Sequence, residues 1–260
     1  MSTVGLHAAA AGPEGGPVVL LGGSLGTTRA MWAPQLPALA RRHRVLAFDH
    51  RGHGASPVPP GPYSIADLAG DVLALMDARG IERAHYAGLS IGGMVGVWLA
   101  ANAQERVGRL VLLCTSAHLE SGDAYRERAR AVRAAGTVEP VADAVVARWT
   151  TPAWARANAD AASALRAMLV ATPAEGYAAC CEAIAAMDLR DQLAGIRAPT
   201  LVIAGAEDPA IPPAHGMALA AAIPGARLEI LHPAAHLASI EQPQAVSALL
   251  LGHLDPSEAP

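Results

Sequence analysis

The sequence lacks lysine altogether and has no block of basic residues. Its formal net charge at pH 7 is −4, and every permanent cation is an arginine. We attribute the missing lysine to a bias in composition and infer no function from it. Without a basic patch, a nucleic acid is not expected as a partner.

Cysteine is scarce and has no useful spacing. The three cysteines are Cys114, Cys180 and Cys181, and no C-x-x-C pair occurs. Adjacent cysteines do not suit an ordinary disulfide, which excludes a disulfide framework. We expect buried free thiols and therefore a cytoplasmic protein.

Long apolar runs are also missing. No stretch is long enough to cross a bilayer, so no membrane association is expected. The first 17 residues, "MSTVGLHAAAAGPEGGP", have neither a basic start nor a continuous apolar run. We therefore expect no signal peptide.

What the chain does have is hydrophobic residues, 52% of 260, enough for one large core. Short β-rich runs alternate with helical patterns, and several runs are apolar on both faces, as in parallel strands covered by helices. This alternation predicts an α/β fold with a mostly parallel, doubly wound sheet. The predicted strands are residues 17–23, 44–50, 83–89, 109–115, 199–205 and 226–232. The clearest predicted helix follows Ser64, with Asp67 as its capping-box partner and Gly80 at its end.

One region interrupts the alternation. Residues 120–192 show only helical patterns, at 123–136, 138–149, 152–171 and 173–188. An insertion between two strands lies where the strands end, and ligands bind there in open α/β folds. We predict that 120–192 is a helical cap on a core formed by 1–119 and 193–260.

The stretch "GLSIG" at 88–92 ends a predicted strand and begins a predicted helix. G-x-S-x-G in that setting is typical of a nucleophile elbow, a tight and strained turn that exposes a serine. Only small residues at Gly88 and Gly92 leave room for such a turn. Ser90 is the predicted nucleophile.

A serine needs a base, and the base needs an orienting acid; in this architecture the chain order is serine, acid, histidine. Asp208 follows one late strand and is preferred to its neighbour Glu207 and to the more distant Glu120. His236 follows the last strand and has enough loop to reach the serine, whereas His232 still belongs to that strand. Asp208 and His236 are therefore the predicted acid and base.

Acyl transfer also needs hydrogen-bond donors for an oxyanion. The residue after the nucleophile, Ile91, would supply one backbone N–H. The loop "GGSLGTT" after the first β-rich run would supply the other, from Ser24 or Leu25. This loop matches neither glycine-rich phosphate-binding pattern.

The pair His50 and His53 in "DHRGHG" resembles half of a metal site, but no third or fourth ligand stands at usable spacing. We predict no metal and no cofactor. A turn held by Asp49 and Arg51 is the preferred interpretation of this motif.

The segments "GLSIGGMVG", "FDHRGHGAS", "AGAEDPAIPP" and "HLASIEQP" together resemble the α/β-hydrolase fold. More narrowly, "GGSLGTTRAMWAPQLPAL" and "GYAACCEAIAAMDLRDQL" resemble the 3-oxoadipate enol-lactonases of bacterial aromatic-acid breakdown. The resemblance covers about residues 17–254. Two positions depart from it: Gly22-Gly23 where a histidine or another polar residue is common, and "HPAAH" where a glycine is common.

The resemblance implies a small-molecule partner, a lactone with a carboxymethyl arm, which a Ser–His–Asp mechanism would hydrolyse. Such an anion needs a local cation, and Arg148 is the candidate, with Trp149 and Trp32 as apolar walls. The alternative interpretation is that Arg148 is a solvated helix residue and that the two tryptophans are core residues.

Three other functions fit the same motifs: a general carboxylesterase, a cofactor-free haloperoxidase-like hydrolase, and a non-catalytic ligand-binding homologue. The oligomeric state and the preferred lactone isomer do not follow from the sequence.

Overall fold

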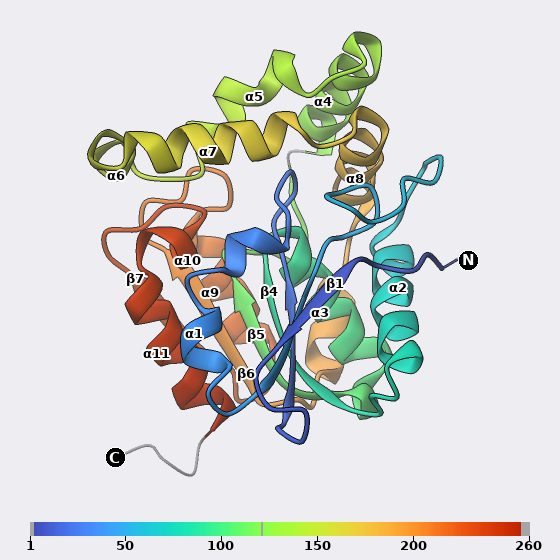
Figure 1. Ribbon diagram of the computed structural model, residues 1–260, viewed down its shortest axis with the longest axis vertical. Coiled ribbons are helices and arrows are strands. Elements are labelled where there is room, and N and C mark those ends of the chain that lie inside the picture. Colours follow the sequence, from blue (N-terminus) through green and yellow to red (C-terminus); the bar gives the residue numbers. More distant parts are fainter. Residues whose placement is uncertain (1–2, 121, 256–260) are drawn as a thin grey trace.

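A seven-stranded sheet forms the centre of the computed structural model, which describes residues 3–120 and 122–255 (Figure 1). The strand order is β1-β3-β2-β4-β5-β6-β7, with β1 antiparallel to β3 and every other pair parallel. The predicted mostly parallel sheet is thus confirmed. The strands are β1 Ala8–Ala11, β2 Val18–Gly22, β3 Arg44–Phe48, β4 Ala84–Leu89, β5 Val107–Leu113, β6 Thr200–Gly205 and β7 Arg227–Leu231.

Helices cover both faces of the sheet. In Figure 1, α2 (Ile65–Ala78) and α3 (Ile91–Asn102) lie to one side, and α1 (Leu36–Leu39) and α11 (Pro243–Leu254) lie to the other. Strand β6 is buried along its whole length, as a central parallel strand should be. The remaining elements outside the insertion are η1 Arg29–Trp32, η2 Gln104–Arg106, η3 Arg190–Gly195, α9 Pro213–Ala222 and α10 Ala238–Glu241.

The N-terminus of α2 has the predicted capping box. The Ser64 hydroxyl accepts from the Asp67 N–H at 3.1 Å, and the Asp67 carboxylate accepts from the Ser64 N–H at 2.9 Å. Gly80, two residues beyond the end of α2, has a φ of +63°, which glycine adopts without steric cost.

In the described residues, five α-helices lie between β5 and β6, above the carboxyl ends of the strands (Figure 1). We refer to them together as the cap segment: α4 Gly122–Ala135, α5 Glu139–Val146, α6 Pro152–Ala157, α7 Ala159–Val170 and α8 Ala174–Ala186. The pattern at 152–171 predicts one helix, but Asn158 leaves the helical conformation, with φ −130° and ψ 51°, and divides it into α6 and α7.

The two ends of the cap segment meet. His118 and Asp188 form an isolated antiparallel bridge, and the Leu189 N–H donates to the Ala117 carbonyl at 2.8 Å. The chain therefore leaves the core and returns to it at nearly the same place.

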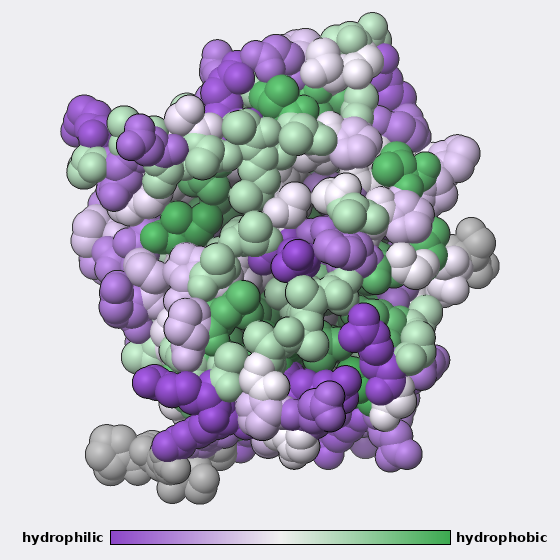
Figure 2. Space-filling view, viewed as in Figure 1, coloured by the Kyte–Doolittle hydropathy of each residue, from purple (hydrophilic) through white to green (hydrophobic). Residues whose placement is uncertain are grey.

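The face drawn in Figure 2 mixes polar and apolar side chains. Among the described residues, the large hydrophobic side chains that are exposed are Val58, Met217 and Ile230. In the same residues no helix combines the length and the hydrophobicity needed to cross a membrane.

Candidate active site

Ser90 lies in the turn between β4 and α3 and has an unusual backbone conformation. Its φ is +58° and its ψ is −120°, a combination that costs energy for any residue with a Cβ atom. A Cβ atom at Gly88 would collide with the backbone of Gly92, and one at Gly92 would collide with the backbone of Gly22. The glycines thus permit the tight turn, which has the geometry of a nucleophile elbow.

His236 and Asp208 lie in the loops that follow β7 and β6. Nδ1 of His236 is 2.8 Å from Oδ2 of Asp208, and both side chains are buried. The other carboxylate oxygen of Asp208 accepts from the N–H groups of Ala210 and Ile211 at 2.8 and 2.9 Å. An acceptor at Nδ1 selects the tautomer whose proton is on Nδ1, so Nε2 is free to accept a proton.

The competing residues lie elsewhere. Glu207, beside Asp208, is exposed to solvent, and so is Glu120. His232 is also exposed, whereas His236 and Ser90 line the same cavity. The structure therefore brings together the serine, acid and histidine that the sequence favours.

Two backbone amides lie near Ser90. Ile91 is the first residue of α3, where the N–H has no acceptor within the helix. In the loop after β2, the Ser24 N–H donates to Sδ of Met31 at 3.2 Å. The Leu25 N–H donates to no described residue. Among the described residues, Leu25 and Ile91 therefore offer free amides, whereas the Ser24 N–H contacts a thioether sulfur.

Two side chains of the "DHRGHG" motif bind to that loop. Gly26 N–H donates to Nε2 of His53 at 2.9 Å, and Nε2 of His50 is 3.2 Å from the Gly23 carbonyl. Burial lowers the pKa of both imidazoles, that of His50 to about 3. Neither residue joins a group of metal ligands within the described part of the chain.

One of the two expected turn interactions is present. The carboxylate of Asp49 accepts from the N–H of Ala55 at 3.2 Å, within the turn. The guanidinium of Arg51 reaches out of the turn to Asp71 of α2, at 2.6 Å. The motif thus forms a turn with Asp49 in the predicted role, whereas Arg51 joins the turn to α2 instead of holding it. The prediction also overlooks the two histidines.

A small cavity lies between these groups and the cap segment. Its lining includes Arg148 and Trp149, as the sequence predicts. Trp32 is not part of this lining. It is fully buried in η1 and so has the core position that was the alternative for it.

The sequence interpretation overlooks Arg128 of α4, which also lines the cavity. Its guanidinium stacks on the Tyr125 ring, 4.8 Å from the ring centroid. Arg128 lies on the same stripe of α4 as the buried Ala129 and Val132. A cation on the buried stripe of an amphipathic helix is the signal that would have identified it.

The charge of the two cavity arginines is not balanced by nearby acids. Within the described residues, neither Arg128 nor Arg148 forms an ion pair. Some arginines outside the cavity form ion pairs: Arg126 pairs with Asp123, and Arg133 pairs with Glu175 at 2.7 Å. The Tyr177 hydroxyl, which also lines the cavity, is buried without a well-aligned hydrogen bond to any described residue.

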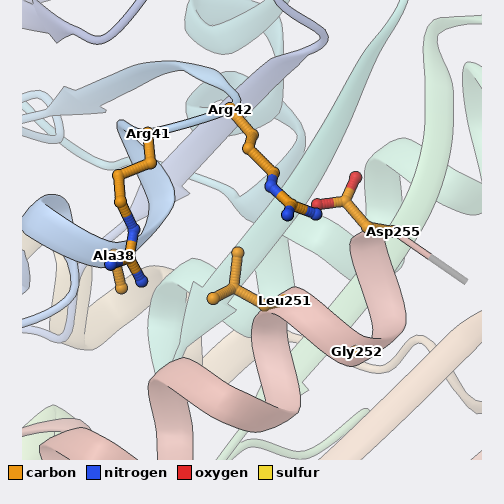
Figure 3. A pocket seen from close by; sticks show the side chains of 6 residues that line it. All are labelled: Ala38, Arg41, Arg42, Leu251, Gly252 and Asp255. Carbon is orange, nitrogen blue, oxygen red and sulfur yellow. The ribbon is translucent and has the colours of Figure 1, made fainter. Parts of the chain in front are cut away.

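Another pocket lies far from Ser90, between α1 and α11 (Figure 3). Arg41, Arg42, Leu251 and Asp255 are among the residues that line it. None of its lining residues is a serine, cysteine or histidine, so it lacks the serine–histidine or cysteine–histidine pair of a hydrolase.

The chain matches the family model of the alpha/beta hydrolase fold over residues 16–243. It is 40% identical to 3-oxoadipate enol-lactonase 2 of Acinetobacter baylyi, over 93% of this chain and 90% of that protein. It is 34% identical to RutD of Azorhizobium caulinodans, a candidate carbamate hydrolase, over 91% of each chain. The crystal structure of the enol-lactonase from Burkholderia xenovorans LB400 is 43% identical, with a TM-score of 0.93 and 96% of each chain covered.

Proposed function

Because the chain belongs to the alpha/beta hydrolase fold family and is similar to 3-oxoadipate enol-lactonases, we propose that it hydrolyses 3-oxoadipate enol-lactone to 3-oxoadipate. That it is a hydrolase follows from the family and from relatives at 37–40% identity. The substrate, the acyl-enzyme mechanism, the place in aromatic-acid breakdown and the cytoplasmic location belong to the proposal.

In the proposed first step, His236 takes the proton of the Ser90 hydroxyl, and Oγ attacks the lactone carbonyl. Asp208 holds the imidazole and stabilises its positive charge through the 2.8 Å contact at Nδ1. The N–H groups of Ile91 and Leu25 stabilise the oxyanion of the tetrahedral intermediate.

The intermediate then collapses, and the bond between the carbonyl carbon and the ring oxygen breaks. The ring oxygen leaves as an enol after it receives the proton from His236, and the enol tautomerises to the ketone. An enolate is a better leaving group than an alkoxide, so ring opening needs no metal. Water, deprotonated by His236, then releases the acid from Ser90.

The observation that carries the choice of substrate is the pair of cavity arginines without acidic partners. The chain as a whole has a net charge of −4, so it does not attract anions in general. Two uncompensated guanidinium groups beside a buried tyrosine hydroxyl instead favour a ligand with a carboxylate. The carboxymethyl arm of the enol-lactone supplies one.

The test is a spectrophotometric assay of enol-lactone loss. The wild-type protein should consume the enol-lactone, and Ser90→Ala should not. Arg148→Ala should raise KM for the enol-lactone at least tenfold and change the hydrolysis of a neutral aryl ester less than twofold. Arg126→Ala is the matched control, since Arg126 pairs with Asp123 at the surface.

Equal losses of Arg148→Ala on the charged and the neutral substrate would mean that Arg148 supports the cap segment and does not bind the carboxylate. Turnover of the aryl ester without turnover of the lactone would favour the general carboxylesterase.

A carbamate hydrolase is the second candidate, because the RutD relative matches nearly the whole chain at 34% identity. A carbamate as small as a carbamic acid has no carboxymethyl arm for the two arginines. Hydrolysis of carbamates in preference to the enol-lactone would overturn the proposed substrate but leave the Ser90 chemistry in place.

A further inference from the structure

The loop that carries the Leu25 amide forms a tight turn. The Thr27 N–H donates to the Ser24 carbonyl at 3.1 Å, and the Thr27 hydroxyl donates to the same oxygen at 2.8 Å. The Ser24 carbonyl and the Leu25 N–H belong to one planar peptide and point in opposite directions. Whatever fixes this turn therefore fixes the direction of the Leu25 N–H.

Gly26 is the third residue of the turn and has a φ of +78°. A positive φ at this position is the mark of a type II turn, in which the central peptide is turned over relative to type I. The central peptide here contains the Gly26 N–H, which donates to Nε2 of His53 at 2.9 Å. A change between the two turn types rotates this central peptide and leaves the Ser24–Leu25 peptide in place. His53 therefore acts on the Leu25 N–H by fixing the position of the loop at the next residue, Gly26.

His53 can accept this bond in only one state. Its Nδ1 is 3.2 Å from the Arg51 carbonyl, so Nδ1 carries the proton and Nε2 is the acceptor. A doubly protonated ring would place two N–H groups against each other. Burial, the largest influence, lowers the pKa of His53, and the neighbouring Asp49 and the bond to the Arg51 carbonyl oppose it.

His50 makes the second attachment. Its Nε2–H donates to the Gly23 carbonyl at 3.2 Å, and the same carbonyl accepts from the Gly92 N–H at 3.1 Å. Gly23 precedes Leu25 by two residues, and Gly92 follows Ile91. One carbonyl thus joins the two segments that bear the free amides, and His50 binds to it.

We propose that His53 is a positioning residue for the oxyanion hole, which keeps the Leu25 N–H aimed at the oxyanion by accepting a hydrogen bond from Gly26, and that His50 supports the same loop at Gly23. Neither histidine touches the substrate. The proposal rests on the proposed acyl-enzyme chemistry at Ser90, but it does not depend on the identity of the lactone.

Two substitutions at one position separate the hydrogen bond from the space that the ring fills. The amide oxygen of Gln reaches about the place of Nε2 and can accept from Gly26, whereas the amide of Asn reaches only the place of Nδ1. His53→Asn therefore loses the bond to the loop, and His53→Gln keeps it.

The assay uses p-nitrophenyl acetate, a neutral ester, and relates kcat to the fraction of sites labelled by a fluorophosphonate. Removal of a whole oxyanion donor costs about 100- to 1,000-fold in kcat, and a misdirected donor should cost less. We expect His53→Asn to lower kcat about 10- to 100-fold with KM within threefold of wild type. His53→Gln should recover most of that loss.

A second readout separates positioning from general structural damage. An alkyl boronic acid adds to a serine to form a tetrahedral anion, so its affinity reports the oxyanion hole. Its inhibition constant should rise in His53→Asn by about the same factor by which kcat falls. The control is His85→Asn, which alters a partly buried histidine at the start of β4, the end of the strand away from Ser90, and should leave both quantities within twofold of wild type.

Equal loss of kcat in the Asn and Gln variants, or a loss without weaker boronate binding, would overturn the positioning role. If Ser90→Ala hydrolyses the ester as fast as wild type, the proposed function itself fails, and the two failures are thereby distinguished.

Discussion

The strained backbone of Ser90 makes a prediction about stability. With φ at +58° and ψ at −120°, a residue with a Cβ atom stores about 1–3 kcal/mol of strain. Glycine relieves that strain but loses about 0.5–1 kcal/mol through the greater freedom of the unfolded chain. Ser90→Gly should therefore be about 0.5–2 kcal/mol more stable than Ser90→Ala. Both variants lack the nucleophile, so the comparison isolates the Cβ atom.

Thermal unfolding measures the difference. For a chain of 260 residues, 1 kcal/mol corresponds to about 2 °C in Tm, so Ser90→Gly should melt about 1–4 °C above Ser90→Ala. The control is Ala100→Gly in the regular part of α3, where the same kind of change should lower Tm. A Ser90→Gly variant that melts at or below Ser90→Ala would refute the argument that the turn is strained.

Two further predictions concern the histidines. His236→Ala should lower kcat on any accepted ester by several orders of magnitude, because the imidazole moves the proton in both half-reactions. His232→Ala should retain nearly full activity. Steady-state kinetics of the two variants measures this, and the opposite result would make His232 the base. Since burial lowers the pKa of His50 to about 3 from an unfolded value near 6.5, the unfolded state binds more protons between those values. The contribution of His50 to the free energy of unfolding should thus be fully present above about pH 6.5. As the pH is lowered further, this contribution should decrease by up to about 1.4 kcal/mol per pH unit. Urea titrations at pH 7, 6 and 5 should show a smaller fall for His50→Gln than for wild type, and identical slopes would contradict the assignment of a neutral His50.

The inner strands can be predicted from the sequence because a strand that is buried on both faces is a continuous run of apolar residues. Runs such as "PTLVIAG" are apolar throughout, and β6 is buried along its length. Strand β1 has no comparable sequence signal. It consists of four alanines at the edge of the sheet, without a β-branched or aromatic residue, and it forms because β3 offers it an antiparallel partner.

The proposed catalytic residues could be predicted for a different reason. A nucleophile elbow needs small residues at fixed positions, and the ends of parallel strands bring the later loops to the same edge of the sheet. Chain order and strand position therefore suffice to propose Ser90, Asp208 and His236. The choice between Ser24 and Leu25 depends on one hydrogen bond, from Ser24 to Met31, which no local pattern reveals.

The cavity wall was harder to predict because tertiary packing decides it. Arg128 lies in the run "RERAR", which has the appearance of a solvated helix face, and only the position of α4 over the core turns its guanidinium inward. His50 and His53 likewise have no visible partners in sequence, since their hydrogen bonds reach across to a loop about 27 residues earlier.

The meeting of the two ends of the cap segment has a consequence for how this protein can be redesigned. His118 pairs with Asp188 where the cap segment leaves and rejoins the core, and β5 and β6 pair with each other directly. The helices between these two residues are therefore the part of the fold to exchange. Ser90, Asp208 and His236 all lie outside that exchangeable stretch, while Arg128 and Arg148 lie within it. The proposed catalytic groups and the proposed carboxylate-binding groups thus lie in separate stretches of the sequence. Leu237, next to His236, donates to the Trp149 carbonyl at 2.7 Å, so a foreign cap joined at His118 and Asp188 would explore new substrates provided that it keeps this bond.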